Sequence, residues 1–256
     1  ESELIKPNNQ NLDFHKNFRK VFTWNDSLVD NMKYFKLNYS YTFPKTINKN
    51  LSVKEKLCVF ISANKKSNHS LELYSERLEA VRWFEKNHLE DFDMYGRGWD
   101  RYRFSSFGGW KITRVLDRIP YLPQFFAKLT NQDYPSYRGI VKDKKKVMKR
   151  YKFSICYENV RDIPGYISEK IFDSFFSGCV PIYWGANNIL DHIPKNCLID
   201  KREFDDYNSL YEFINNMDDD TYLEYLENID LFLNSDKSRQ YSIKYFTDTV
   251  IANILE

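Results

Sequence analysis

The stretch from Tyr151 to Gly185 constrains the fold more than any other part of the chain, because its pattern is that of a strand, a loop, a helix and a second strand. Residues 152–157 and 179–184 are rich in aromatic and β-branched residues, as buried strands are. Between them, Ser168 is a suitable N-cap for an apolar, helically spaced segment that Gly178 would end. A helix of about ten residues between two apolar strands predicts a βαβ unit of a parallel sheet.

This unit gathers polar side chains at one edge of the predicted sheet: Glu158, Asn159, Tyr166, Ser168, Glu169 and Lys170. Ligands of open α/β sheets bind beyond the carboxyl ends of the strands, near helix N-termini. The free N–H groups of a helix start, together with Lys170, favour a phosphate. Each residue also has a plainer interpretation, with Glu169 complementing the helix dipole, Lys170 solvated and Asn159 capping a turn. The residues alone predict a phosphate-bearing ligand and leave these alternatives open.

The same segment carries a resemblance to a known family. The run FSICYEN, followed by GYISEKIFDSFFSGCVPIYWG, resembles the donor-site signature of the α-1,3/4-fucosyltransferases, glycosyltransferase family 10, with Tyr157 in place of the usual Phe. The resemblance implies a GT-B-type α/β enzyme with a Rossmann-like parallel-sheet donor domain and part of an N-terminal acceptor domain. It also implies an inverting α-1,3-fucosyltransferase that moves L-fucose from GDP-fucose to O3 of GlcNAc or glucose in a glycan.

Roles for individual residues follow from the resemblance. Glu1, in the segment E-S before Pro7, corresponds to the catalytic carboxylate, and Glu169 is the second expected catalytic residue. The expected donor-binding residues are Arg77, Asn159, Tyr166, Ser168, Glu169 and Lys170. The plainer interpretation of Arg77 is a solvated helix arginine, and that of Glu1 is a mobile terminal carboxylate, which without the family has no catalytic weight. Arg82 is the alternative to Arg77.

Two supporting residues are expected from their places at predicted strand ends. Glu158 follows the strand 152–157 and is expected to orient the polar groups around it. Arg97 lies in the glycine-containing turn that ends the predicted strand 92–99, and is expected to border the site.

Two D-x-D patterns could hold a metal ion at a diphosphate. Asp91 and Asp93 stand at the start of a predicted strand, which is the wrong edge for the ligand. Asp218 begins a run that precedes a helix and reads as an N-cap cluster. We therefore expect no protein-held metal and no cofactor besides the co-substrate GDP-fucose.

Length and composition set the broader class. The 256 residues suffice for one large or two small domains. We expect residues 1–50 to be the C-terminal part of the acceptor-side domain and residues 51–256 to form the donor domain with its C-terminal helices. A net charge of +2 with 29% charged residues gives no case for a nucleic-acid partner. The expected partners are GDP-fucose and an oligosaccharide such as N-acetyllactosamine or lipopolysaccharide O-antigen.

Cysteine usage and the chain start bear on location. The four cysteines are far apart and show neither metal nor disulfide spacing, which favours a reduced interior. Because the numbering begins at Glu1, we expect a preceding segment. A bacterial cytoplasmic location, peripheral at the inner membrane, is expected, or the Golgi if the preceding segment carries an anchor. The basic run 143–149 is either a solvated face or a contact for an anionic membrane.

Other elements are predicted from periodicity. Strands are expected at 20–24, 36–43 and 56–62, and helices at 26–34, 71–87, 204–217, 222–233 and 243–255. The aromatic residues Trp24, Tyr39 and Tyr41 belong either to the core or to an acceptor groove. A non-catalytic nucleotide- or glycan-binding protein of the same fold is the alternative function. A dinucleotide enzyme is disfavoured, because no G-x-G-x-x-G follows the strand 56–62.

Overall fold

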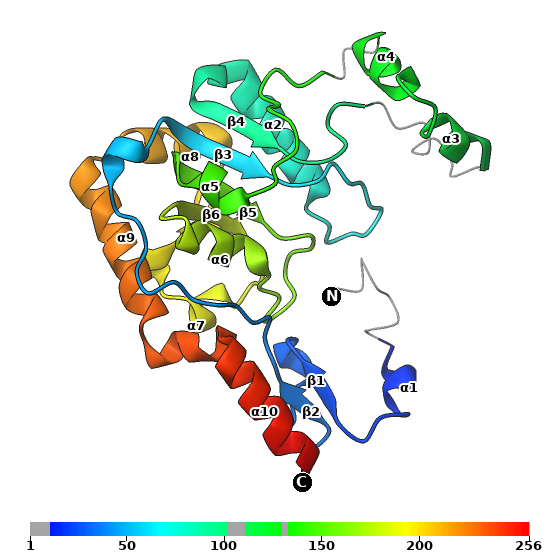
Figure 1. Cartoon of the computed structure of the whole chain (residues 1–256), viewed down its shortest axis with the longest axis vertical. Coiled ribbons are helices and arrows are strands. Elements are labelled where there is room, and N and C mark those ends of the chain that lie inside the picture. Colours follow the sequence, from blue (N-terminus) through cyan, green and yellow to red (C-terminus); the bar gives the residue numbers. More distant parts are fainter. Residues whose placement is uncertain (1–10, 102–110, 130–132, 256) are drawn as a thin grey trace.

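The computed structural model describes residues 11–101, 111–129 and 133–255, and its centre is a five-stranded sheet (Figure 1). The strands are β3 (Lys56–Ile61), β4 (Phe92–Tyr95), β5 (Tyr151–Tyr157), β6 (Val180–Trp184) and β7 (Ile199–Asp200). They pair in the order β4-β3-β5-β6-β7, and every pair is parallel. The predicted βαβ unit and parallel α/β fold are confirmed, because α6 (Glu169–Phe176) connects the neighbouring strands β5 and β6.

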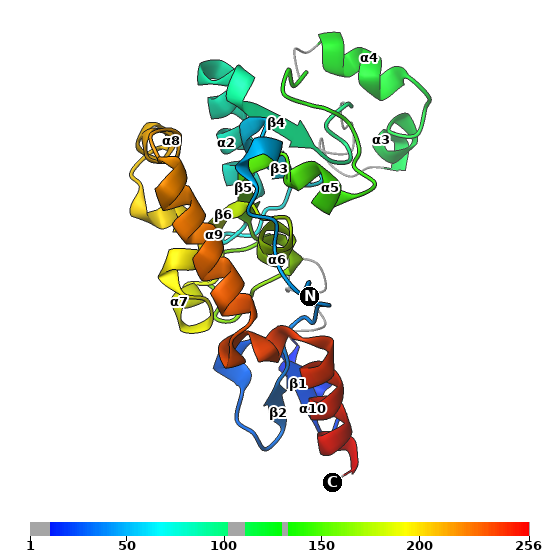
Figure 2. The same ribbon diagram turned by 60° about the vertical axis from the view of Figure 1, so that its left-hand side comes forward.

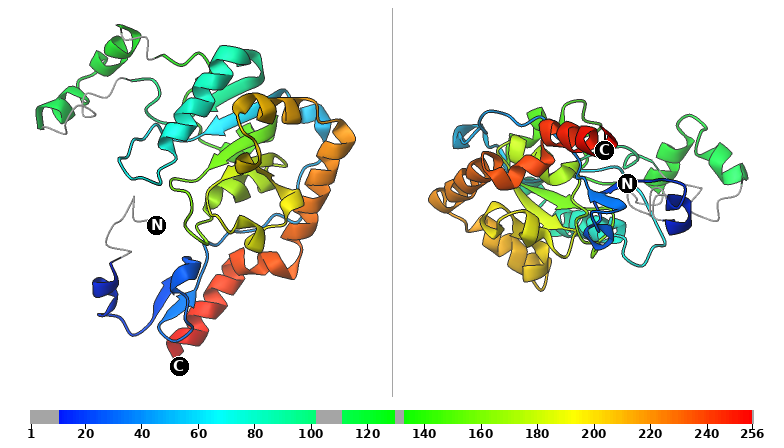
Figure 3. Two further views of the ribbon diagram at one scale, coloured as in Figure 1. Left: turned by 180° about the vertical axis from the view of Figure 1, so that it is seen from behind. Right: turned by 90° about the horizontal axis from the view of Figure 1, so that it is seen from below.

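Helices cover both faces of this sheet, which is why its strands are almost continuously apolar. Helices α5 (Lys144–Met148) and α6 lie on one face, and α2 (Tyr74–Asn87) and α8 (Tyr207–Asn215) lie on the other (Figures 1 and 3). On the second face, Phe84 of α2 stacks on Phe92 of β4 with ring centroids 4.7 Å apart. Because helices cover both faces of the sheet, packing from two sides fixes the positions at which its strands end.

The remaining elements lie outside the five-stranded sheet, and those within residues 12–43 form a small N-terminal unit. They are α1 (Leu12–His15), β1 (Val21–Thr23), β2 (Tyr34–Lys36), α3 (Lys111–Leu116), α4 (Leu122–Leu129), α7 (Ile189–His192), α9 (Asp219–Leu233) and α10 (Ile243–Leu255). Strands β1 and β2 form a separate parallel pair. Helix α10 runs back beside this pair (Figure 2), where the Lys20 ammonium donates to the Asn253 carbonyl at 2.6 Å.

The predicted strand 36–43 is wrong. Pairing in β2 ends at Lys36, and beyond it the chain is extended with one isolated bridge, between Tyr41 and Ser242. The alternating aromatics that suggested a strand pack on α6 instead, with Tyr41 stacked on Phe172 at 4.6 Å and Phe43 5.5 Å from Phe176. Helix packing and sheet pairing produce the same alternation here, so the sequence could not separate them.

Three further boundaries differ from the predictions. The expected helix 26–34 is only a 3-10 turn over Asp26–Leu28, because the backbone is already extended at Val29, with φ −66° and ψ 120°. Helix α2 starts at Tyr74 rather than residue 71, since the Glu72 carboxylate accepts hydrogen bonds from the first N–H groups of the helix. Strand β4 ends at Tyr95 rather than residue 99.

All four cysteines are free and buried. Within the described residues, no helix combines the length and the apolar character that crossing a membrane requires.

Asp26 ties the N-terminal unit to the sheet domain. Its carboxylate accepts hydrogen bonds from Lys36 at 2.5 Å, from Asn188 at 2.8 Å and lies 2.7 Å from the His192 ring nitrogen. Burial acts to raise the pKa of Asp26, but its hydrogen-bond partners outweigh burial and hold the pKa below the ordinary value. The ionised carboxylate therefore stabilises the folded chain.

We expect Asp26→Asn to lower the free energy of unfolding at pH 7 by about 1–3 kcal/mol, because two partners lose a charged acceptor. Since the folded pKa of Asp26 is depressed, its contribution is complete above about pH 4 and declines as the pH falls through the folded value. Urea unfolding between pH 7 and pH 3 should thus show wild type and variant converging in acid. Asp236→Asn, at a 93% exposed side chain, is the control and should match wild type. A constant difference at all pH values would contradict this assignment.

Candidate functional site

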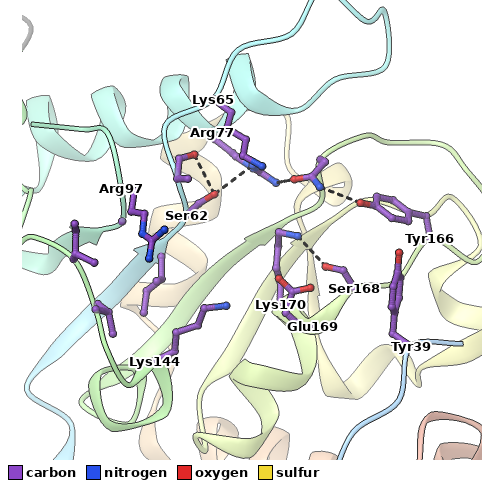
Figure 4. Close-up of a pocket in the computed structure, with 16 residues that line it drawn as sticks. Tyr39, Ser62, Lys65, Arg77, Arg97, Lys144, Tyr166, Ser168, Glu169 and Lys170 are labelled. Atoms are coloured by element: carbon purple, nitrogen blue, oxygen red, sulfur yellow. Dashed lines mark hydrogen bonds between the residues drawn. The ribbon is translucent and has the colours of Figure 1, made fainter. Parts of the chain in front are cut away.

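A cleft of about 360 Å³ opens at the carboxyl ends of β3, β4 and β5, beside the N-terminus of α6 (Figure 4). Its lining residues are Tyr39, Ile61, Ser62, Ala63, Lys65, Arg77, Gly96, Arg97, Ile140, Val141, Lys144, Asn159, Tyr166, Ser168, Glu169 and Lys170. This is the edge at which parallel α/β sheets bind ligands. The fold thus brings segments more than 100 residues apart to one place.

The structure gathers most of the predicted site residues at this cleft. Seven of them line it: Arg77, Arg97, Asn159, Tyr166, Ser168, Glu169 and Lys170. Glu158 lies beneath the cleft and is fully buried. Glu1 lies outside the described residues, so its expected catalytic role remains a prediction.

The buried carboxylate of Glu158 organises the start of α6. It accepts hydrogen bonds from the Ser168 backbone N–H and hydroxyl, both at 2.7 Å, and from the Lys170 ammonium at 2.9 Å. Gly185 makes room for it, since a Cβ there would lie 2.5 Å from the Glu158 Cγ. Glu158 therefore positions Ser168 and Lys170 from beneath the cleft. Among the described groups, Lys170 is the cation that balances the charge of Glu158.

Ser168 does not cap α6 in the predicted way. Its hydroxyl donates to Glu158 and accepts from Lys170 at 2.8 Å, and it makes no capping hydrogen bond to the helix backbone. The first N–H groups of α6 consequently point toward the cleft without a side-chain cap. Free N–H groups at the positive end of the helix dipole favour an anionic ligand.

Arg77 is buried. Its side chain is 2% exposed and donates to the Tyr157 carbonyl at 2.7 Å and to the Asn159 side-chain oxygen at 3.0 Å. Burial lowers the pKa of Arg77, although an arginine remains charged at neutral pH. The alternative of a solvated helix arginine is therefore excluded.

A hydrogen-bonded wall extends from Arg77 across the cleft. Asn159, held by Arg77, donates to the Tyr166 hydroxyl at 3.1 Å, as the dashed lines in Figure 4 show. Tyr166 in turn lies against Trp24 of the N-terminal unit, with ring centroids 4.8 Å apart. Asn159 is therefore more than a turn cap, because it links α2 to the loop before α6.

Positive charge dominates the cleft. Lys65, Arg97, Lys144 and Lys170 line it with Arg77, and Glu169 is the one carboxylate among the described residues that line it. Lys144 pairs with Asp173 at 3.0 Å, whereas Lys65 and Arg97 form no ion pair within the described part of the chain. An excess of cations facing a helix N-terminus suits a ligand with two or more negative charges.

Glu169 is ionised in this setting. Burial acts to raise its pKa, but the positive charge of Lys170, a hydrogen bond from its own backbone N–H and the charge of Lys144 together outweigh burial and hold the pKa below the ordinary value. A carboxylate kept charged beside a cationic site can accept hydrogen bonds from ligand hydroxyls.

The sequence analysis did not name Lys65, and it named Tyr39 only as an alternative acceptor-groove residue and Lys144 only within the basic run 143–149. Lys65 lies in the loop after β3, so the rule that strand ends line the site would have found it. Lys144 and Tyr39 are far from such a strand end in the sequence. Their segments reach the cleft through long-range pairing, for example the hydrogen bond from the Gly96 N–H to the Gly139 carbonyl at 3.0 Å.

Neither D-x-D pattern faces the cleft. Asp93 is engaged by Lys56 at 3.1 Å, Arg138 at 2.8 Å and Tyr151 at 2.7 Å, at the start of β4. Asp218 caps α9 through Thr221, as the sequence predicted. His88, Glu90 and Asp91 lie close enough to share one cation, but they stand at the opposite edge of the sheet from the cleft.

Similarity to known proteins centres on the segment that builds this site. Residues 125–244 match the family model of the glycosyltransferase family 10 (fucosyltransferase) C-terminal domain. An alpha-(1,3)-fucosyltransferase of Helicobacter pylori is 32% identical over 74 residues, which are 29% of this chain and 15% of that protein. An alpha-(1,4)-fucosyltransferase of Arabidopsis thaliana is 38% identical over 80 residues, 30% of this chain and 20% of that protein.

Solved structures show the same fold. A crystal structure of an alpha1,3-fucosyltransferase superposes with a TM-score of 0.57 and 16% identity over 90% of this chain and 66% of that chain. One with GDP-fucose superposes with a TM-score of 0.50 and 18% identity over 80% of this chain and 48% of that chain. The chain therefore spans half to two thirds of these structures, and aligns with a fifth or less of the two sequence relatives. The predicted GT-B-type architecture is confirmed.

We expect Glu158→Gln to lower the free energy of unfolding by about 2–4 kcal/mol, because it leaves Lys170 beside a neutral group in a buried site. Lys170→Met removes the stranded charge, so the double variant should lose less than the sum of the two single variants. Urea unfolding of all four proteins measures this coupling. Glu55→Gln, which removes a surface pair with Arg150, is the control and should leave the midpoint unchanged. Strict additivity would show that the pair does not organise the site.

Proposed function

We propose that the chain is a member of glycosyltransferase family 10, whose C-terminal family model matches residues 125–244, and that it transfers L-fucose from GDP-fucose to a hydroxyl group of a glycan. The observation that supports this best is the cationic cleft at the strand ends, where Lys170 and the uncapped start of α6 meet. A nucleoside diphosphate matches that charge, and family membership selects GDP-fucose among such ligands. A fucosyltransferase of known structure was solved with that donor.

The first task of such a transferase is to stabilise the leaving diphosphate. As the bond from C1 of fucose to the phosphate oxygen breaks, its electron pair passes to GDP, and negative charge grows on the diphosphate. We propose that Lys170, Lys65 and Arg97 neutralise this charge, with the start of α6 and Arg77 behind them. The engagement of Asp93 by protein groups supports a route without a protein-held metal.

The second task is to activate the acceptor. Its hydroxyl oxygen forms the new bond to C1 from the face opposite GDP, so the configuration inverts, and its proton passes to a base. We propose Glu1 as that base, on the family resemblance. The ionised Glu169 would hydrogen-bond sugar hydroxyls or stabilise the positive charge that develops on the fucose ring. Asn159 and Tyr166 would hold the donor through their shared hydrogen bond.

A second hollow supports a saccharide acceptor. About 430 Å³ in volume, it lies between the N-terminal unit, α6 and α10, and shares Tyr39 and Glu169 with the first cleft. Its aromatic lining residues are Phe22, Trp24, Tyr39, Tyr41 and Phe246. Aromatic faces pack against the C–H faces of sugar rings, while Glu169 accepts from hydroxyls. We propose that the acceptor ring occupies this hollow, with O3 of GlcNAc or glucose toward Glu169.

We expect Lys170→Met to lower kcat/KM for acceptor-stimulated GDP release by about 10²–10³-fold, the usual effect of removing one group that stabilises transition-state charge. Release of GDP from GDP-fucose is measured with and without N-acetyllactosamine. Lys86→Met, the same change at an exposed lysine of α2, is the matched control.

GDP release that is unchanged in the Lys170→Met variant would show that the diphosphate does not bind in this cleft. A GDP-induced rise in melting temperature without any turnover would instead favour a non-catalytic nucleotide-binding protein.

We expect Phe246→Ala to raise the KM for the acceptor by about fivefold to tenfold, with an unchanged KM for GDP-fucose, because one aromatic contact contributes about 1 kcal/mol. Phe213→Ala, at a partly exposed phenylalanine of α8, is the control. A change in the KM for GDP-fucose alone would place the donor, rather than the acceptor, against Phe246.

A further inference from the structure

The segment 111–129, named here the apolar arm, exposes several large apolar side chains within a short stretch of chain. It comprises α3 and α4 and stands away from the sheet domain (Figures 1 and 2). Its exposed residues are Ile112 (66%), Val115 (57%), Ile119 (41%), Tyr121 (83%), Phe125 (58%) and Leu129 (63%). Single exposed apolar residues are ordinary, but a cluster of this kind marks a surface that contacts something apolar.

The exposed residues follow helical spacing. Ile112, Val115 and Ile119 recur at intervals of three and four, and Phe125 and Leu129 are four apart. The buried Ala127 lies between the latter two, so in this turn of α4 a small side chain faces inward while Phe125 and Leu129 face outward. This is the reverse of the arrangement that a helix adopts when its apolar face packs on its own domain.

The arm is also basic, and this positive charge indicates the kind of surface that the arm contacts. Residues 111–129 contain four lysines or arginines and one aspartate, and Arg118 is exposed. Helix α5, with three successive lysines, lies along the same side of the molecule in Figure 2. Two of these lysines have internal contacts, Lys144 with Asp173 and Lys145 over the Phe176 ring. Apolar side chains flanked by positive charge are what an anionic lipid surface attracts.

We propose that the apolar arm docks this protein on an anionic lipid bilayer, with its exposed side chains among the lipid headgroups. Helix α4 has eight residues and α3 six, far fewer than the ~20 that a helix spanning the bilayer needs. The arm therefore lies in the interface. The sequence had suggested α5 as the membrane contact. The structure adds the apolar part, which basic residues alone do not provide.

The position of the arm in the chain means that docking on a bilayer would also affect the cleft. The arm leaves the sheet after Gly96 and Arg97 at the end of β4, and the chain returns through Ile140 and Val141. All four of these residues line the cleft. A docked arm thus holds the mouth of the cleft near the lipid surface, where a glycan carried on a lipid would be presented. This last step rests on the proposed function, whereas docking itself does not.

The test is co-sedimentation with vesicles of phosphatidylcholine alone and of equal parts phosphatidylcholine and phosphatidylglycerol. The wild-type chain should bind the anionic vesicles at least about fivefold more. The arm variant Ile112→Ser/Val115→Ser/Phe125→Ser should reduce that binding at least about fivefold. The control variant Leu190→Ser/Phe213→Ser/Leu231→Ser alters three exposed apolar residues elsewhere and should bind as wild type does.

The other outcomes overturn the proposal. Equal binding by the arm variant and wild type, no binding by wild type, or equal binding to both vesicles would each do so. Light scattering that shows a wild-type dimer and a monomeric arm variant would assign the arm to self-association instead. The GDP-induced thermal shift is measured in all three proteins. Its persistence shows that they are folded, and its absence in all three would count against the proposed function while leaving the vesicle result interpretable.

Discussion

The site depends on one buried carboxylate. Glu158 is fully buried at the end of β5, and its oxygens bind the Ser168 N–H, the Ser168 hydroxyl and the Lys170 ammonium. A buried charge is tolerated only when it is paired and hydrogen-bonded, so these three contacts are mutually required. They direct Ser168 away from capping α6, which leaves the first N–H groups of that helix facing the cleft. One interaction thereby sets both the position of the lysine and the availability of the helix start.

Arg77 likewise holds polar groups of the cleft in place, from the other side of β5. Its buried guanidinium bridges Ser62 after β3 to Tyr157 and Asn159 at the end of β5. The polar groups of the cleft are thus held by two buried charges of opposite sign, Glu158 and Arg77. Cations outside this network, Lys65 and Arg97, remain for a ligand. A preorganised site of this kind suits a reaction that develops charge on a leaving diphosphate, because its dipoles need no reorganisation during the reaction.

The N-terminal unit and α10 complete the surroundings of the cleft. Asp26 connects this unit to α7, Trp24 lies against Tyr166, and Tyr39 and Tyr41 extend from β2 toward Glu169. The second hollow arises only where these segments meet α6 and Phe246 of α10. The apolar arm lies in the chain between two segments that line the cleft, one with Gly96 and Arg97 and one with Ile140 and Val141. The first cleft and the second hollow share Tyr39 and Glu169.

The sequence by itself determined the βαβ unit and the edge at which its polar residues gather, because periodicity, a helix stop and strand-end position are local properties. It also supplied seven of the residues that line the cleft. Tertiary structure alone decided that Arg77 is buried, that Ser168 serves Glu158 instead of capping α6, and that the aromatics after β2 pack on a helix. It also brought Lys144 and Tyr39 to the site. These outcomes depend on which distant groups meet, and one residue's identity and spacing do not encode its long-range partners.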